Sequence, residues 1–358
     1  MANIFDYLDW RKDIAFYSDP FNDIDNLVLS ELAYVDYEGI LDNKDCSVEE
    51  VAQRYFEIHD KKEIEKRKTF FRLAPFLFEK LKDSKRFKGM MLRKYINEVD
   101  TDRDLQISAV TFEFRDFIYV AYRGTDDTLI GWKEDFDFSY KMKTEGQKRA
   151  LSYLEEVAND YSKKILVGGH SKGANFAMYA AMHCSKDVQK RIRKVYFNDG
   201  PGFLKEMWKG IPLSFKRKVK RIGPENSTIG ALLENPIPCT YCKSTQIGLM
   251  QHDLLSWQVL GNQLVLSEQV KVSQLFEKSI QEWIADVDLE QRKEFVEIIF
   301  KTFEKAGVYG LEDFSTHRIQ ILKAINSRPK EESEQVQSLI KKLLGNSWDV
   351  LISSVKNR

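Results

Sequence analysis

Residues 165–177 combine a serine with a local pattern that could make it a nucleophile. Three β-favouring apolar residues lead into a glycine pair, and Ser171 is followed by a further glycine and by apolar residues at helical spacing. This is the pattern of a strand, a sharp turn and a helix. A serine at such a turn has a strained backbone, so small residues must flank it for the strand and the helix to pass closely. Gly169 and Gly173 are the flanking residues.

The five residues Gly169-His170-Ser171-Lys172-Gly173 fit G-x-S-x-G, the nucleophile elbow of α/β-hydrolases. With 18 glycines in 358 residues, a pattern this short can also arise by chance. The strand before it and the helix after it make the match more specific. The alternative is a glycine-rich turn between a strand and a helix that merely contains a serine.

A serine nucleophile needs a base within hydrogen-bond reach and an acid that orients the base. The chain has five histidines. We expect His170, inside the elbow, to point away from the position of a base. His59 falls in a predicted helical segment, His183 follows the elbow helix, and His317 falls in the C-terminal region. His252 follows the last predicted strand, in the chain order serine, acid, histidine, and we predict it as the base rather than a structural histidine.

Three carboxylates are candidates for the acid. Asp199 follows the strand after the elbow, Glu225 follows the next strand, and Asp253 is adjacent to His252. Asp199 stands beside glycines and could equally form a turn. We favour Asp199 slightly, because it directly follows a rigid strand end, and keep Glu225 and Asp253 as alternatives.

Strands and helices alternate around these residues. We expect a hairpin over 107–122, an amphipathic helix over 145–161, and strands at 195–198, 219–222 and 240–244. This order predicts an α/β fold with a doubly wound, mostly parallel sheet, whose functional residues lie in loops after the carboxyl ends of the strands.

The sequence resembles a known family at a second motif. Arg123-Gly124-Thr125 follows a predicted strand, and the G-H-S-x-G motif begins about 45 residues later. This is similar to the class 3 (fungal-type) lipases of the α/β-hydrolase superfamily, over about residues 20–265. The resemblance implies that Thr125 helps to form the oxyanion hole, and the backbone N–H of Lys172 would be its second donor. Class 3 lipases keep their acid in the loop that carries Glu225 here.

The motifs Gly-His-Ser-Lys-Gly, Asp199-Gly-Pro-Gly and Gln251-His252-Asp253 also resemble a bacterial lipase-like family without assigned function. Two residues depart from the lipase pattern: Lys172 replaces an apolar residue, and Ala174 replaces a common glycine. Lys172 could favour an anionic substrate, but we expect its side chain to reach solvent. No surface-active lid is recognisable, so triglycerides are not the expected substrate.

We predict an α/β-hydrolase domain over 1–267, with a helical insertion at about 47–105, and a helical appendage over 268–358. Ser47 and Glu50 form a capping-box pattern, and the apolar run 70–81 is either core or the inner wall of a cap, with core preferred. In the appendage we expect helices at 270–276, 280–284, 295–303, 317–325 and 336–344. Their apolar faces could pack on the hydrolase domain or make a homo-oligomer.

Composition narrows the class of function. Lys+Arg and Asp+Glu balance at 55 each, so the whole-molecule charge favours neither nucleic acid nor an anionic membrane as a partner. The basic run 216–221 is too short, and lacks the aromatic residues, to change this expectation. We expect a cytoplasmic protein without a signal peptide or an integral membrane segment. The four cysteines are too few for a disulfide scaffold, and one C-x-x-C pair, at 239–242, is too little for zinc.

These observations predict a serine esterase or lipase-like hydrolase that cleaves an ester or thioester of small or medium acyl length. The reaction would pass through an acyl-enzyme on Ser171 and needs no cofactor and no metal. The alternative is a non-catalytic binding or regulatory protein that keeps the hydrolase scaffold.

Overall fold

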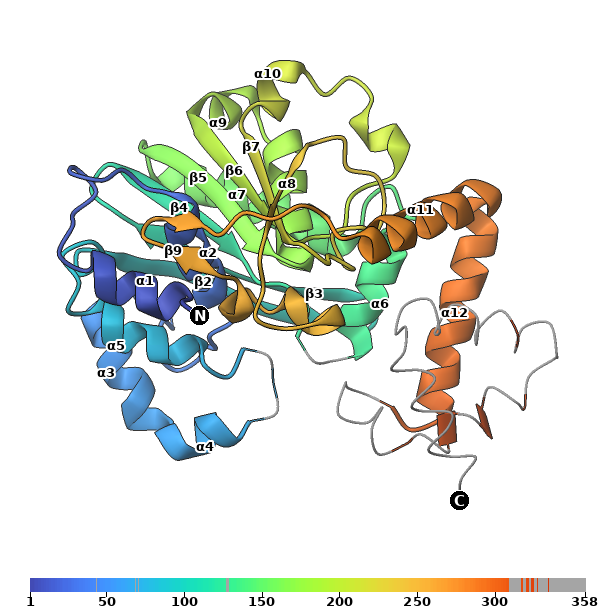
Figure 1. Cartoon of the computed structure of the whole chain (residues 1–358), viewed down its shortest axis with the longest axis horizontal. Coiled ribbons are helices and arrows are strands. Elements are labelled where there is room, and N and C mark those ends of the chain that lie inside the picture. The colour runs from blue at the N-terminus through green and yellow to red at the C-terminus, as the bar shows by residue number, and fades with distance from the viewer. Residues whose placement is uncertain are drawn as a thin grey trace.

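The computed structural model describes residues 1–308, apart from 43, 68, 70, 127 and 128, and a few isolated residues further on: 317, 320, 321, 323, 324, 327 and 334. In this part of the chain, an eight-stranded sheet carries helices on both faces (Figure 1). The predicted α/β architecture with a mostly parallel sheet is confirmed.

The strands of the main sheet lie side by side in chain order. They are β1 (Cys46–Ser47), β2 (Met91–Asp100), β3 (Leu105–Glu113), β4 (Phe117–Tyr122), β5 (Lys164–His170), β6 (Ile192–Asn198), β7 (Val219–Pro224) and β8 (Cys239–Cys242). The pairs from β1 to β4 are antiparallel, and the pairs from β4 to β8 are parallel. The parallel half carries all the predicted site residues at the carboxyl ends of its strands or in the loops that follow.

One face of the sheet is covered by the helices that connect the parallel strands: α7 (Glu145–Asp160), α8 (Lys172–His183), α9 (Lys186–Arg191) and α10 (Leu213–Lys216), with the 3-10 turn η2 (Lys205–Trp208). The start of α7 is fixed by a capping box between Thr144 and Gln147. Its apolar stripe, including Ala150 and Leu154, packs with α8 on the sheet in one buried cluster.

The opposite face is covered by N-terminal helices, α1 (Ile4–Arg11), α2 (Asp23–Leu32), α3 (Val48–Ile58), α4 (Lys61–Lys66) and α5 (Leu77–Leu81), with the turn η1 (Ala74–Phe76). The capping box of Ser47 and Glu50 opens α3 as predicted. The apolar run before residue 82 is core, since Leu77, Phe78 and Leu81 are fully buried. Short elements complete this side: η3 (Gly248–His252), η4 (Leu254–Ser256), β9 (Val259–Leu260) and β10 (Gln263–Leu264).

The predicted helical insertion at about 47–105 was wrong toward its C-terminal end, because residues 91–100 form β2. The predicted insertion of 47–105 therefore includes a long strand of the main sheet and the first residue of β3. A register shift between Arg93 and Ile96, with Lys94 at a φ of 52°, breaks the alternation of inward and outward side chains. Pairing with the buried strand β3 makes this segment a strand, and its own residue pattern does not reveal that pairing.

The first two appendage helices are α11 (Lys271–Asp286) and α12 (Leu289–Lys305). Figure 1 draws them in orange, with α12 on the side of α6 (Leu129–Asp137). The rings of Phe300 and Phe136 lie 5.5 Å apart, and Arg292 donates to the Ser139 carbonyl at 2.8 Å. The predicted helix at 336–344, and most of that at 317–325, lie outside the described residues. Within the described part, every helix is too short or too polar to span a membrane.

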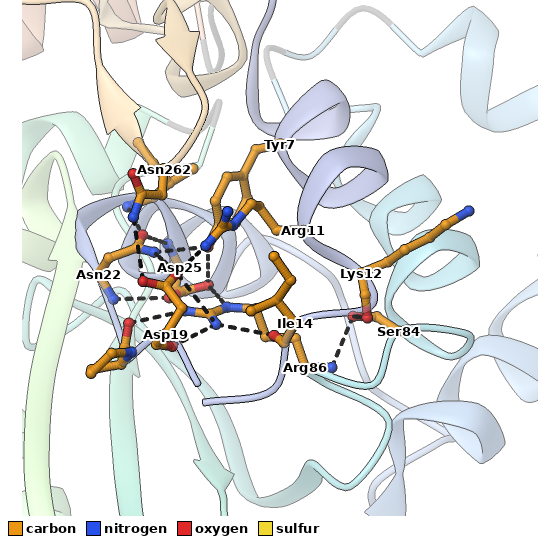
Figure 2. A network of polar contacts seen from close by, with 12 residues as sticks. Tyr7, Arg11, Lys12, Ile14, Asp19, Asn22, Asp25, Ser84, Arg86 and Asn262 are labelled. Carbon is orange, nitrogen blue, oxygen red and sulfur yellow. Dashed lines mark hydrogen bonds and ion pairs between the residues drawn. The ribbon is translucent and has the colours of Figure 1, made fainter. Parts of the chain in front are cut away.

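A buried ion pair joins the N-terminal helices to the segment after α5 (Figure 2). Arg86 donates from Nε to Asp25 at 2.7 Å, and Tyr7 donates to the same carboxylate at 2.7 Å. Burial raises the pKa of Asp25, and the bonds from Arg86 and Tyr7 oppose that rise. Arg86 also donates to the carbonyl of Asp19, whose side chain accepts from Arg11. This network fixes α1 and α2 over the sheet.

Breaking this pair is predicted to destabilise the fold. Asp25→Asn leaves the buried Arg86 without its counter-charge, so we expect the free energy of unfolding to fall by about 3–5 kcal/mol. Urea unfolding followed by circular dichroism measures it. The exposed pair of Lys80 and Asp9 is the control, because Asp9→Asn should cost less than about 1 kcal/mol. Equal losses in the two variants would contradict the prediction.

Candidate active site

The turn between β5 and α8 has the geometry of a nucleophile elbow. Ser171 stands between them with a φ of 58° and a ψ of −133°, a strained conformation for a residue with a side chain. A Cβ on Gly169 would lie 2.5 Å from the carbonyl carbon of Gly173, and one on Gly173 would lie 2.1 Å from the oxygen of Tyr122. Both glycines are therefore required by close backbone contacts, and the predicted strand, turn and helix are confirmed.

The loop after β4 lies directly beside the elbow. A Cβ on Gly124 would lie 2.9 Å from the Cβ of Ser171 and 2.7 Å from the oxygen of His170. Thr125, the next residue, donates its hydroxyl to Asp135 of α6. Lys172 is the first residue of α8, where backbone N–H groups have no acceptor within the helix. The structure thus places Lys172 and the loop of Gly124 and Thr125 next to Ser171, and the role of Thr125 and Lys172 as oxyanion donors stays a prediction.

His252 lies at the same end of the sheet as Ser171. Its Nδ1 is 2.6 Å from Oδ2 of Asp199, and its ring centroid is 4.3 Å from that of His170, the residue before Ser171. With Asp199 as acceptor, Nδ1 carries the proton and Nε2 is left as the basic nitrogen. His252 is partly accessible, with 20% of its side chain exposed, whereas the Asp199 side chain is almost fully buried.

Asp199 is held by its backbone conformation and by two hydrogen bonds besides the one to His252. Its backbone has a φ of 44°, its N–H donates to the Ile222 carbonyl at 2.8 Å, and the Ser227 hydroxyl donates to its Oδ1. Sequence reasoning assigned no role to Ser227. Its position in the loop after β7, close to the alternative acid Glu225, is the feature of the sequence that could have indicated a role.

The two alternative acids are engaged elsewhere. Glu225 accepts from the Ser267 hydroxyl at 2.5 Å, and its backbone N–H donates to the Cys242 carbonyl. Asp253 accepts from the Leu255 N–H at 2.9 Å and so caps the short turn η4. The carboxylate that meets His252 is that of Asp199, as the sequence slightly favoured, and its role as the acid stays a prediction.

A buried amide network below the elbow was not foreseen. Asn198, at the end of β6, donates from its side chain to the Gly169 carbonyl at 2.9 Å, and its backbone carbonyl accepts from the Ser171 N–H at 3.0 Å. Asn26 and Ser30 of α2 bond to the same side chain. One asparagine therefore holds both the elbow and the strand end that leads to Asp199. The feature of the sequence that could have indicated this role is an asparagine at the end of an otherwise apolar strand.

The expectation that His170 points away from the base was wrong, because its ring packs against that of His252. Its Nδ1 is 2.8 Å from the hydroxyl of Tyr34, whose ring stacks on Phe71. Burial lowers the pKa of His170 well below its usual value, and the charge of His252 lowers it further. His170 is thus a neutral, buried neighbour of His252.

The expectation that Lys172 reaches solvent was also wrong. Its side chain is only 1% exposed and forms an ion pair with Glu134, with Nζ 3.3 Å from Oε2. Gln106 of β3 accepts from the same ammonium at 2.8 Å. These partners come from distant parts of the chain, so local sequence could not reveal them. A buried ammonium cannot receive an anionic substrate group from solvent.

The C-x-x-C pair is two free thiols at the ends of β8. Burial raises the pKa of Cys239 to about 12, so this thiol stays protonated at neutral pH. Among the described residues no group of three or more His, Cys, Asp or Glu side chains could hold a metal ion.

A protein-family model described as Mbeg1-like matches residues 81–301, which is more than half of the chain. The chain belongs to the Mbeg1-like family. The match runs through α11 and most of α12, beyond the range of the predicted lipase resemblance. A search of curated proteins found no match for this Mbeg1-like protein.

Several solved structures to which this chain is similar are lipases. The Rhizomucor miehei lipase propeptide complex has 14% identity and a TM-score of 0.33, over 43% of this chain and 57% of that chain. Lip2 lipase from Yarrowia lipolytica has 16% identity and a TM-score of 0.32, over 53% and 77%. A fungal lipase–inhibitor complex has 13% identity and a TM-score of 0.36, over 68% and 80%. The Mbeg1-like protein thus spans little more than half of the Rhizomucor chain.

The mostly parallel sheet and the turn between β5 and α8 confirm the predicted α/β-hydrolase fold.

Asp135 is predicted to make the stability of the Mbeg1-like protein fall as pH rises. Burial raises its pKa to about 6, although Lys172 and the Thr125 hydroxyl bond lower it. The folded state therefore holds a proton that the unfolded state releases at lower pH, and stability falls between about pH 4 and pH 6. Asp135→Asn removes this loss and should be more stable than wild type at pH 7 by on the order of 1–3 kcal/mol, with the gain vanishing near pH 4.

Urea unfolding at a series of pH values measures the difference. Asp187→Asn is the control, because Asp187 is exposed and Lys190 lowers its pKa, so this variant should gain nothing above pH 6. A stability difference between Asp135→Asn and wild type that is constant with pH would contradict the prediction.

Proposed function

We propose that this protein is a serine hydrolase that cleaves an ester or thioester through an acyl-enzyme on Ser171. The observation that carries the proposal is the hydrogen bond between His252 and Asp199 at the end of the sheet where the strained elbow presents Ser171. A nucleophile, a base and a buried acid from three separate loops are what this chemistry needs.

In the proposed reaction, His252 Nε2 takes the proton of the Ser171 hydroxyl as Oγ attacks the substrate carbonyl carbon. The carbonyl oxygen becomes an oxyanion, and the backbone N–H groups of Lys172 and Thr125 donate to it, each lowering the barrier by about 3 kcal/mol. His252 then gives its proton to the leaving alcohol or thiol as the carbon–oxygen or carbon–sulfur bond breaks. Water, activated by the same imidazole, releases the acid from Ser171.

Asp199 would keep His252 in the tautomer that the reaction requires. Its Oδ2 accepts from Nδ1, while Ser227 and the backbone around a φ of 44° fix the carboxylate in place. Because this carboxylate is buried, its attraction for the imidazolium formed during the reaction is little screened by solvent.

Apolar side chains near His252 support an acyl substrate. Ile247 and Met250 lie in the segment that leads to His252, with exposed fractions of 82% and 45%. Tyr34 and Phe71 stack on each other beside His170. The exposed Ile247 and Met250 and the half-buried Tyr34 and Phe71 favour contact with a small or medium acyl chain.

Ser171→Ala tests the nucleophile. We expect it to stay folded and to lose at least about 10³-fold in turnover of p-nitrophenyl esters of graded chain length, because no other group replaces the attacking oxygen. A fluorophosphonate probe should label the wild-type protein at Ser171 and leave the variant unlabelled. A folded wild-type protein that neither labels nor turns over esters would instead support a non-catalytic binding protein on the hydrolase scaffold.

Asp199→Asn and Glu225→Gln form a matched pair that tests the acid. Asp199→Asn should lower kcat by about 10⁴-fold, because the amide can hold His252 in the wrong tautomer. Glu225→Gln should stay within about 3-fold of wild type, because its carboxylate bonds to Ser267 and not to the base. Steady-state kinetics on the best ester measure both. The reverse order of effects would assign the acid to Glu225.

A further inference from the structure

The ammonium of Lys172 lies in a buried polar site formed by β3 and α6, close to the elbow. Its Nζ is 2.8 Å from Gln106 Oε1, 3.3 Å from Glu134 Oε2 and 3.5 Å from the Gly131 carbonyl oxygen. An ammonium has three N–H donors, and this site offers three acceptors from β3 and α6. The position of Lys172 is thus set from two separate elements.

Glu134 connects this site to the neighbouring helices. Its Oε1 accepts from the Thr144 hydroxyl at 2.8 Å and from the Gly146 N–H at 3.0 Å, at the start of α7. A Cβ on Gly146 would lie 2.2 Å from this oxygen, so Glu134 fits closely against the backbone. The carboxylate is fully buried, and its two oxygens join α7 to Lys172 of α8.

Consecutive carboxylates of α6 contact Lys172 of the elbow and Thr125 of the loop after β4. Glu134 pairs with Lys172, and Asp135 accepts from the hydroxyl of Thr125. The backbone N–H groups of Lys172 and Thr125 are the two oxyanion donors of the proposed function. One turn of α6 is therefore in contact with both Lys172 and Thr125, whose backbone N–H groups would have to keep a fixed separation.

We propose that the buried ion pair of Lys172 and Glu134 is a positioning pair, which fixes α6 to the elbow and thereby sets the separation of the two oxyanion donors. This inference rests on the proposed function and deepens it. The pair acts through the backbone of Lys172 and does not touch the substrate.

Stability alone does not explain an ion pair in this place. Two charges lose hydration when they are buried, and well-packed apolar residues can replace a buried pair at little cost or with a gain. An apolar side chain would fill the volume around Phe176, whose ring lies 5.6 Å from Nζ. It would not make directional bonds to β3 and α6 at once. The pair contributes a fixed geometry, which oxyanion stabilisation requires within a fraction of an ångström.

Helix α12 supports α6 from another side. Phe300 packs on Phe136, the residue after Asp135, and Arg292 bonds to the Ser139 carbonyl just beyond the end of α6. With Glu134 holding α6 to the elbow, the helix is fixed by both the sheet domain and the appendage. Loss of the ion pair leaves the contact with α12 and the bond of Asp135 to Thr125, and removes the ion pair between α6 and Lys172 of the elbow.

Three variants test the proposal: Lys172→Met, Glu134→Gln, and the double variant Lys172→Met with Glu134→Leu. For each we expect kcat on the best p-nitrophenyl ester to fall about 10–100-fold, with KM within about 3-fold, because the donors are displaced while the acyl contacts remain. The rate of fluorophosphonate labelling at saturating probe should fall in parallel. Glu134→Gln keeps the acceptor for Thr144 and Gly146, and it carries the test if Lys172→Met does not fold.

Glu113→Gln is the control, because it weakens the ion pairs of Glu113 with Arg93 and Lys163, which lie at the other end of the sheet from the elbow. It should lose stability yet keep the wild-type kcat per folded molecule. The double variant separates positioning from stability. If it recovers stability but keeps a low kcat, the proposal holds; recovery of the wild-type kcat, or wild-type kcat in the single variants, overturns it.

Amide hydrogen exchange gives a readout that does not depend on turnover. In Lys172→Met and Glu134→Gln, exchange should become at least about 10-fold faster in α6 and in the first turn of α8, but not in Glu113→Gln. If the wild-type protein is inactive but the variants show this exchange pattern, the proposed function is refuted, while the ion pair still fixes α6 to the elbow. Unchanged exchange in α6 would overturn the link itself.

Discussion

The close approach of β4, β5 and α8 is the constraint on which the rest of this structure depends. The carbonyl of Tyr122 and the backbone of Gly173 are so near that any side chain on Gly173 would clash. Gly124 and Gly169 are confined in the same way. Three positions without side chains thus let two strands and a helix converge, and the residue at their meeting point, Ser171, accepts a positive φ as a consequence.

Such a convergence buries backbone and side-chain polar groups, and amides and a charged pair form hydrogen bonds with several of them. Asn198 bonds to the Gly169 carbonyl and accepts from the Ser171 N–H, so strain at the elbow is balanced by fixed hydrogen bonds. On the other side, Lys172 and Glu134 bond to each other inside the fold. Each partner comes from a different helix or strand, so the elbow is the point that ties α2, β6 and α6 together.

The arrangement of the acid follows from the same geometry. In a parallel sheet, neighbouring strands end at the same edge, so the loops after β6 and β7 both reach the elbow. Asp199 is the carboxylate aimed at His252, because its backbone turns sharply at the end of β6 and Ser227 from the next loop supports it. Glu225, one strand further, meets Ser267 instead. Asp199 and Glu225 thus follow neighbouring strands, and only the carboxylate of Asp199 lies at His252.

The sequence by itself determined the local elements: the elbow at 169–173, the hairpin before it, the strand end that carries Asp199, and the place of His252 in the segment after the last parallel strand. These rest on glycine spacing and on apolar periodicity, which are local properties of the chain. Only the tertiary structure decided β2, because its bulge hides the alternation and β3 supplies the pairing. The burial of Lys172 and the packing of His170 on His252 were decided there too. Lys172 bonds to Glu134 and Gln106, and His170 packs on His252, and all these partners are distant in sequence. A local sequence pattern does not show which distant groups will be buried together in a low-dielectric site.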